Sequence, residues 1–263
     1  MIADHVEEAV DRLIADRDAN REIDHWPESW RPVSPEEAYA IQDAVHARRA
    51  AMGQPIGGWK IGCTTPVMQQ MLGIPTPCAG GVLAAAMFGS PAELPFDGFV
   101  KPMAECEIAM RLDRNVPPRV GGYNGETIAE YVGSCHAAIE LAEGRYRDRN
   151  ERTAAEFIAD DFFQKAIVVG PPVRDWRSID LAGVRGTTSA GGEAKGEGRG
   201  GDVMGHPMNA LAWLADHLAE RGRRIKAGDI VLTGSVVMAT PIERGKEVVC
   251  GVEGLGEARL TLN

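Results

Sequence analysis

The sequence has no Cys-X-X-Cys pair, and its five cysteines are scattered and odd in number. This pattern excludes a disulfide framework and a zinc site of the usual spacing, and it is typical of free thiols in a reducing compartment. The chain also lacks any apolar run that approaches the roughly 20 residues of a membrane-spanning helix. Its N-terminal stretch has neither the basic flank nor the apolar core of a secretion signal. We therefore expect a cytoplasmic protein with no membrane partner.

Positive charge is scarce as well. Lysine and arginine total 28 against 38 aspartate and glutamate residues, which gives a formal net charge of −10. Because binding to nucleic acid depends on clustered Lys and Arg that neutralise phosphates, this balance argues against a nucleic-acid partner. With 263 residues, 44% of them hydrophobic, the chain can bury a core as one large domain, alone or with a small appendage.

Two helices are expected at the start of the chain. Apolar positions recur at helical spacing in residues 4–19. Residues 34–53 begin with Ser34 as N-cap and Glu37 three positions later, which is the pattern of a capping box. We therefore expect a helical N-terminal segment over residues 1–55.

Short apolar runs broken by glycine and proline follow, and they predict a β-rich domain over residues 56–263. Two further helices are expected within it, at residues 127–144 and 207–222. The runs expected as strands are residues 57–63, 80–87, 105–112, 163–170, 229–238, 247–254 and 258–262.

Two carboxylates lie two residues apart in one of these predicted strands. Since side chains alternate between the faces of a strand, Glu105 and Glu107 should share a face while Cys106 points the other way. One interpretation is a strand with a solvated and a buried face. The other is that both groups are ligands of Mg²⁺ or Mn²⁺, which prefer oxygen donors. Glu140 is a candidate third ligand, although taken alone it reads as an ordinary carboxylate at a helix end.

An ordered set of motifs bears on this choice. The motifs are GWKIG (58–62), ECE (105–107), AIELAEGRY (138–146), FIAD (157–160), MGHPMNALAWLADHLAERG (204–222), AGDIVLTG (227–234) and GLG (254–256). Together, over nearly the whole chain, they resemble the fumarylacetoacetate hydrolase superfamily. Within it, they are similar to the branch of 2-keto-4-pentenoate hydratases, 2-oxohept-3-enedioate hydratases and 4-oxalocrotonate decarboxylases. The resemblance implies an α+β fold, a mixed β-roll with surrounding helices and a helical N-terminal segment.

The resemblance also implies roles for four side chains. The family's metal-binding carboxylates fall on Glu105, Glu107 and Glu140, and its catalytic lysine falls on Lys60. A 2-oxo acid would chelate the metal, which stabilises the enolate formed when a proton leaves the substrate. Lys60 would move that proton, because burial and a nearby metal both lower the pKa of a lysine. Without the motif, Lys60 would read as a lysine at a strand end that reaches the surface.

The chain departs from the branch at three places. Cys78 stands where hydratases usually carry an acid, and decarboxylases also lack that acid. Asp161 and Gln164 belong to a segment, ADDFFQK, that is bulkier than the polar substrate-lining segment usual in the family. Arg199, in a glycine-rich stretch, could bind a second carboxylate of the substrate in two bonds or could simply be exposed on a loop.

Two further residues are candidate substrate contacts. His206 precedes Pro207 at an expected helix start, a position that suits a helix cap as well as a substrate contact. Thr233 ends an expected buried strand, where the family places groups near the substrate carboxylate.

The function expected from this reading is a divalent-metal-dependent lyase of aromatic catabolism that adds water to a short 2-hydroxydienoate, an unsaturated 2-oxo acid. Alternatives are decarboxylation of a 2-oxo-enedioate of the 4-oxalocrotonate type and hydrolysis of a carbon-carbon bond in an acylpyruvate. A non-enzyme alternative is a catalytically weak partner subunit, since hydratases and decarboxylases of this branch associate. The resemblance also implies a homo-oligomer.

Overall fold

The computed structural model describes residues 2–23 and 26–263. The helices are α1 (Ile2–Asp18), α2 (Pro35–Ala51), α3 (Pro66–Leu72), α4 (Gly125–Ala129), α5 (Ala154–Ala159) and α6 (Pro207–Glu220). The strands are β1 (Ile56–Gly62), β2 (Cys78–Leu83), β3 (Met87–Gly89), β4 (Ala92–Leu94), β5 (Pro102–Leu112), β6 (Val132–Glu143), β7 (Gln164–Val169), β8 (Arg185–Ala190), β9 (Glu193–Arg199), β10 (Ile230–Pro241), β11 (Glu247–Val252) and β12 (Gly256–Leu262). The prediction of a fold that turns β-rich after its N-terminal helices is confirmed.

The described strands form two mixed sheets. One has the order β2-β1-β10-β5-β6-β7-β3, and in it β1 runs parallel to β10 while β5 pairs antiparallel with both β10 and β6. The other has the order β4-β12-β11-β8-β9. Strands β11 and β12 pack against β5 and β6, so both faces of these two central strands are covered. Charged groups can therefore lie deep inside the protein, on the face of β5 and β6 turned away from β11 and β12.

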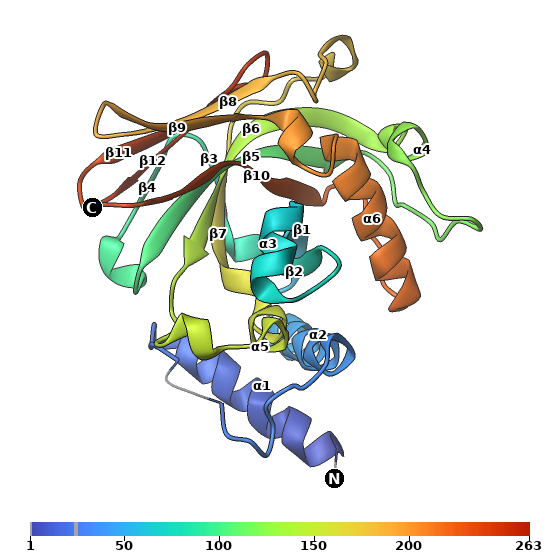
Figure 1. Cartoon of the computed structure of the whole chain (residues 1–263), viewed down its shortest axis with the longest axis vertical. Helices are drawn as coiled ribbons and strands as arrows, with labels where there is room; N and C mark the ends of the chain where they lie inside the picture. The colour runs from blue at the N-terminus through green and yellow to red at the C-terminus, as the bar shows by residue number, and fades with distance from the viewer. Residues whose placement is uncertain (1, 24–25) are drawn as a thin grey trace.

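The N-terminal helices lie together with α5 at one end of the molecule, below the strands in Figure 1. Helix α2 is capped as expected, since the Ser34 hydroxyl accepts from the Glu37 backbone N–H. In a complete capping box the Glu37 carboxylate would accept from the N–H of Ser34. Here it accepts instead from the N–H of Val33, the residue before Ser34. The chain leaves the helix at Gly53, whose φ of 79° suits glycine.

The region predicted as a helix over residues 127–144 was predicted wrongly. Only residues 127–129 are helical there, as the end of α4, and after a turn residues 132–143 form β6, in which nearly every residue is buried. A strand covered on both faces gives an unbroken apolar run, which periodicity alone does not separate from a buried helix. Arg199, for which the sequence left open a substrate contact or an exposed position on a loop, is the last residue of β9 in the β8–β9 hairpin.

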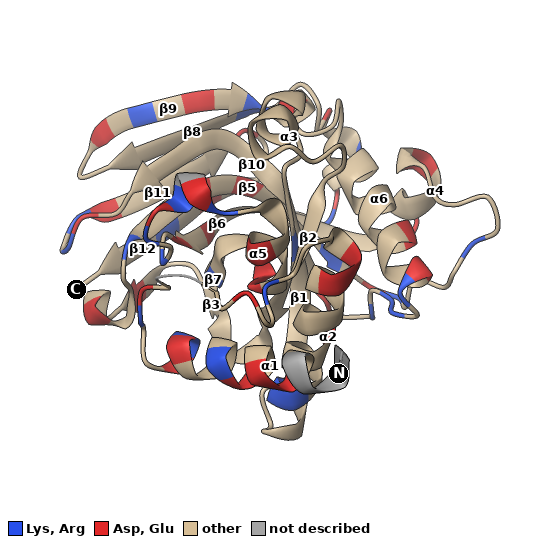
Figure 2. Ribbon diagram, turned by 60° about the horizontal axis from the view of Figure 1, so that its bottom comes forward, with Lys and Arg blue, Asp and Glu red and all other residues tan. Residues whose placement is uncertain are grey.

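Exposed elements carry charges of both signs. Figure 2 shows acidic and basic residues interspersed along α1 and β9. Pairs such as Arg185 with Glu197 and Lys195 with Glu193 link these side chains on β8 and β9. No helix among the described residues is both long and apolar enough to cross a bilayer.

Candidate active site

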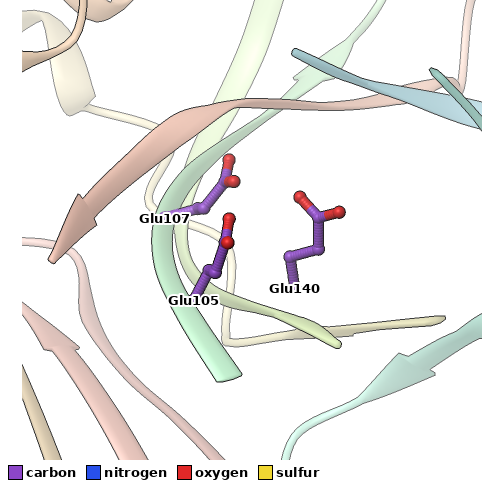
Figure 3. Close-up of side chains that lie close together, drawn as sticks. All are labelled: Glu105, Glu107 and Glu140. Atoms are coloured by element: carbon purple, nitrogen blue, oxygen red, sulfur yellow. The ribbon is translucent and has the colours of Figure 1, made fainter. Parts of the chain in front are cut away.

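Three glutamates from adjacent strands meet inside the larger sheet. Glu105 and Glu107 alternate with Cys106 on β5 and share a face, as predicted. Glu140 lies on β6 directly across from Glu105 in the antiparallel register. One oxygen from each carboxylate lies within 4.8 Å of the other two, and Figure 3 shows the carboxyl groups side by side. The structure therefore brings together the residues predicted as metal ligands.

These carboxylates have few protein partners. Glu107 and Glu140 are fully buried, and Glu107 Oε2 accepts from Gly234 N–H at 2.8 Å. Glu107 Oε1 and Glu140 Oε2 have no hydrogen-bond partner among the described residues. Buried polar oxygens are nearly always paired, so unpartnered ones that face each other fit a bound cation. The oxygen donors here suit a hard divalent cation.

The electrostatics of the cluster point the same way. Burial, followed by the charge of Glu140, raises the pKa of Glu105 to about 7. Burial and the two neighbouring carboxylates raise the pKa of Glu107 well above its usual range. Like charges this close disfavour full ionisation, and a bound divalent cation removes that penalty.

Lys60 completes the cluster from β1. Its side chain is buried, and Nζ lies 3.1 Å from Glu140 Oε1 and donates to the Phe162 carbonyl at 2.9 Å. Burial on its own lowers the pKa of Lys60, but Glu140, Glu105 and Glu107 raise it, and the net shift is upward. The expectation of a lowered pKa is thus wrong for the chain by itself, because the three carboxylates outweigh desolvation.

Glycines make room for the lysine. Lys60 pairs with Gly80 on β2, where a Cβ would lie 2.5 Å from the Asp161 carbonyl oxygen and 3.2 Å from Lys60 Cδ. A Cβ at Gly62 would lie 2.5 Å from the Phe162 ring. The GWKIG motif therefore reflects close packing around the lysine stem and the segment after α5.

That segment is a 3-10 turn, η4 (Asp161–Phe163), with left-handed backbone at three successive residues. The φ angles of Asp161, Phe162 and Phe163 are 52°, 49° and 68°. Such angles are unfavourable for residues other than glycine and persist only where surrounding contacts hold them. The turn points the Phe162 carbonyl at Lys60.

Helix α2 supplies one such contact. Asp161 Oδ1 accepts from Gly81 N–H at 2.7 Å and lies 2.7 Å from His46 Nε2, while Arg17 of α1 lies 3.7 Å from Oδ2. Burial would raise the pKa of Asp161, but His46, Arg17 and the Gly81 N–H together lower it to about 2. The carboxylate predicted to line the substrate site is thus engaged by protein groups.

At the position where hydratases carry an acid, this chain has Cys78, whose thiol lies next to a second thiol. Cys78 is buried on β2, and its thiol contacts that of Cys63, which follows β1. That hydrogen bond and burial raise the pKa of Cys78 far above its usual range. A thiol that stays protonated is a poor base for water.

The remaining predicted contacts have these surroundings. Gln164 is buried, and with its amide nitrogen and oxygen exchanged it donates to the Gly81 carbonyl at 3.2 Å. Thr233 Oγ1 donates to the Ile108 carbonyl at 2.9 Å. His206 caps α6, with Nδ1 accepting from Met208 N–H at 3.0 Å.

Arg199 is exposed, and its guanidinium donates to the Gly183 carbonyl at 3.1 Å. No interaction joins it to the three glutamates among the described residues, so its role as a substrate contact stays a prediction. Sequence reasoning missed His46 and Phe162. His46 lies 115 residues before its partner Asp161, and Phe162 has a left-handed backbone that no local pattern marks.

Comparison with known proteins identifies the relatives of this chain. The family described as fumarylacetoacetate (FAA) hydrolase C-terminal matches residues 82–263. A 2-keto-4-pentenoate hydratase of Paraburkholderia phymatum is 34% identical over 229 residues, which cover 86% of this chain and 85% of that protein. A 2-hydroxyhexa-2,4-dienoate hydratase of Comamonas testosteroni is 32% identical over 84% of this chain and 83% of its own length.

Among solved structures, the fold matches 4-oxalocrotonate decarboxylase from Pseudomonas putida G7, complexed with magnesium and adipate, with a TM-score of 0.92. The two chains are 22% identical, and the match covers 99% of this chain and 98% of that one. The expected mixed β-roll fold is therefore confirmed.

Proposed function

This chain belongs to the fumarylacetoacetate hydrolase family, and from that membership and its acidic cluster we propose that it is a divalent-metal-dependent lyase that hydrates a short 2-hydroxydienoate. The observation that carries the proposal is the cluster of Glu105, Glu107 and Glu140 beside Lys60, with buried oxygens that lack protein partners. The relatives named hydratases support the reaction type.

The cofactor we propose is Mg²⁺ or Mn²⁺, held by the three glutamates. When bound there, the ion would supply Lewis-acid polarisation of the 2-oxo group. The chain's own residues provide charge balance and shape. Glu140 attracts the Lys60 ammonium at 3.1 Å, and the Phe162 carbonyl fixes its direction at 2.9 Å.

Lys60 is the proposed proton carrier. Nζ lies 3.1 Å from Glu140 Oε1, and it is buried, so a proton held there is kept from bulk water. Proton transfer by a positioned side chain contributes about 10²–10⁴-fold to rate. The face of the Phe162 ring, whose centroid lies 5.1 Å from Nζ, adds a second contact that holds the ammonium.

Decarboxylation of a 2-oxo-enedioate is the second candidate, and Cys78 favours it. Water addition needs a group that holds or activates water, and the Cys78 thiol, whose pKa is raised by its hydrogen bond with Cys63 and by burial, is no base at the position of the usual acid. Loss of carbon dioxide needs no water, and it uses the same polarised 2-oxo group.

The test is to incubate metal-stripped protein with 2-hydroxypenta-2,4-dienoate or with a 2-oxo-enedioate, with and without Mg²⁺ or Mn²⁺, and to follow products by NMR. The proposal predicts a metal-dependent 4-hydroxy-2-oxo acid from the first compound. Metal-dependent release of carbon dioxide from the second alone would assign the decarboxylase instead. Turnover of neither compound in the presence of metal would contradict both assignments.

A small 2-oxo acid is thus the proposed ligand, and the family implies assembly into a homo-oligomer, with association with a related decarboxylase or hydratase as a further proposal. Size-exclusion chromatography with light scattering tests the first point. A monomer at micromolar concentration would contradict it.

A further inference from the structure

A buried histidine of α2 lies between an arginine and an aspartate. His46 is 4% exposed, and its Nε2 lies 2.7 Å from Asp161 Oδ1. Its Nδ1 lies 2.9 Å from Nη1 of Arg223, on the segment that follows α6. Two hydrogen bonds therefore connect Arg223, which is partly buried, through His46 to the η4 turn.

The arginine determines which ring nitrogen of His46 carries the proton. A guanidinium has five N–H donors and no acceptor, and it stays protonated in proteins. The hydrogen bond between Arg223 and His46 therefore requires an unprotonated Nδ1 that accepts. The proton of the ring is then on Nε2, which donates it to the Asp161 carboxylate.

Two further contacts hold the guanidinium of Arg223 in this orientation. Its central carbon lies 4.6 Å from the centre of the Trp59 ring. Its Nη1 also pairs with Asp43 of α2, whose carboxylate accepts from Arg221 as well. Because the guanidinium is planar and held by a ring face and a carboxylate, its hydrogen bond to His46 has a defined direction.

A glycine gives the imidazole access to Asp161. A Cβ at Gly81 of β2 would lie 2.6 Å from both Nε2 and Cε1 of His46. The Gly81 N–H donates at 2.7 Å to Oδ1 of Asp161, the same oxygen that His46 contacts. The approach of His46 to the η4 turn therefore depends on a glycine at residue 81.

Asp161 links these hydrogen bonds to the active site. It begins η4, and the carbonyl of the next residue, Phe162, accepts from Lys60 Nζ at 2.9 Å. Both turn residues have left-handed backbone, with φ of 52° and 49°, which persists only where contacts hold it. A movement of the Asp161 carboxylate would therefore move the carbonyl that orients Lys60.

We propose that Arg223 is a positioning residue for Lys60, because by keeping His46 protonated at Nε2 it fixes Asp161 and hence the carbonyl that accepts from the lysine. The inference rests on the proposed function, in which Lys60 carries the proton. A misplacement of about 1 Å caused far from the reacting atoms can lower a rate by about 10²-fold. Among the described residues, no hydrogen bond or ion pair joins Arg223 to Lys60, so it acts through His46.

The first test reads the protonation of His46 by NMR of the full chain, labelled with ¹⁵N, at pH 7. Long-range ¹H–¹⁵N correlations show which ring nitrogen is protonated, and the signals of His46 are those absent from His46→Gln. We expect a proton on Nε2 alone in the original chain and in Arg223→Lys, whose ammonium also has only donors. In Arg223→Met, Nδ1 should gain a proton. A protonated Nδ1 in the original chain, or an unprotonated one in Arg223→Met, would overturn the proposal.

The second test is steady-state kinetics of the metal-loaded chain on the compound that it turns over. Arg223→Met should lower kcat at least tenfold and leave KM within twofold, since it displaces the proton carrier and not the metal that holds the substrate. Arg223→Lys should keep kcat within threefold of the original. The matched control is Arg224→Met, at the exposed neighbouring arginine, which should change neither constant. An unchanged kcat in Arg223→Met would contradict the positioning role, even if the variant were less stable.

A measurement without turnover separates this inference from the proposed function. The ammonium signal of Lys60, identified by its absence in Lys60→Met, is read in the same labelled samples. If the original chain turns over neither compound with metal, the proposed function fails. A shifted Lys60 signal in Arg223→Met would then still support the positioning of the lysine, and an unchanged signal would overturn it. If the original chain is active and Arg223→Met keeps its kcat, the inference fails alone.

Discussion

At the scale of single residues, Lys60 is the group on which the proposed chemistry depends. It is buried, contacts Glu140, and donates to a carbonyl from a separate segment, so its position is fixed from more than one side. A lysine held this way can deliver or take a proton at one point in space. Removing its ammonium should therefore affect rate far more than binding of the cation.

We expect Lys60→Met to lower kcat by about 10²–10⁴-fold, the usual contribution of a positioned acid or base, while the chain still binds Mn²⁺. Steady-state kinetics and a Mn²⁺ titration measure the two effects. Lys195→Met, on the exposed strand β9, should leave kcat unchanged. A Lys60→Met variant with kcat within a factor of three of the original would show that another group moves the proton.

Asp161 gives a pH-dependent prediction. Its pKa in the folded chain, about 2, lies below its ordinary value of 3.8, because His46, Arg17 and the Gly81 N–H outweigh burial. The carboxylate therefore contributes stability that is fully present above pH 3.8 and is lost as pH falls toward 2. A shift of this size corresponds to about 2 kcal/mol.

We expect Asp161→Asn to lower the free energy of unfolding by about 2 kcal/mol at pH 7, with the difference shrinking below pH 4. Urea unfolding at a series of pH values measures it. Asp113→Asn, at a half-exposed surface carboxylate, should change stability by less than about 0.5 kcal/mol. A difference for Asp161→Asn that stays constant down to pH 3 would contradict the linkage.

At the scale of secondary-structure elements, the site depends on two strands and one turn. Strands β5 and β6 set the glutamates opposite each other by register, and η4 brings a carbonyl to Lys60. Contacts from α1 and α2 hold η4 in place. Arg17 of α1 donates to Asp160, and His46 of α2 pairs with Asp161. Backbone strain in the turn is thus offset by contacts from the helical segment.

Close packing of β2 against η4 leads to a test with a matched pair of glycines. Gly80→Ala would place a Cβ 2.5 Å from the Asp161 carbonyl oxygen, so the turn must shift and carry the partner of Lys60 with it. We expect kcat to fall at least tenfold and stability to fall by about 1–3 kcal/mol. Gly89→Ala, on β3 with open space around it, should change neither. Normal kinetics for Gly80→Ala would show that η4 does not position the lysine.

The sequence predicted part of this arrangement. Alternation along a strand placed Glu105 and Glu107 on one face, and helical spacing with a cap predicted α2 and α6. The chain around Glu140 was predicted as a helix because a strand buried on both faces shows no alternation. The η4 turn could not be predicted, since its left-handed residues include no glycine and are held by partners 80 or more residues away, such as Gly81 and His46.

At the scale of the whole molecule, the cluster is a buried site in which folding brings together like charges. Three carboxylates from β5 and β6 lie within 4.8 Å of one another in the folded chain, and nothing holds them together in the unfolded one. A cation that binds only the folded state stabilises it by mass action. We expect this stabilisation to come from the cluster, because Glu107 and Glu140 have buried oxygens without hydrogen-bond partners that a cation can bind.

We therefore expect Mn²⁺ at a hundred times its Kd to stabilise the chain by about 2.7 kcal/mol. For a chain of this size that is a rise in Tm of about 5 °C, read by differential scanning calorimetry. The rise should disappear in Glu107→Gln and persist in Glu126→Gln, an exposed carboxylate in the first turn of α4. An equal rise in both variants would place the cation elsewhere.

The most direct measurement of the central claim is the affinity of metal-stripped protein for Mn²⁺ by isothermal titration calorimetry. The claim is that Glu105, Glu107 and Glu140 form one divalent-cation site. It predicts one ion per chain, an affinity lowered at least a hundredfold in Glu107→Gln and in Glu140→Gln, and no change in Glu126→Gln. Binding of the same strength in all of these variants, or no binding to the original chain, would contradict it.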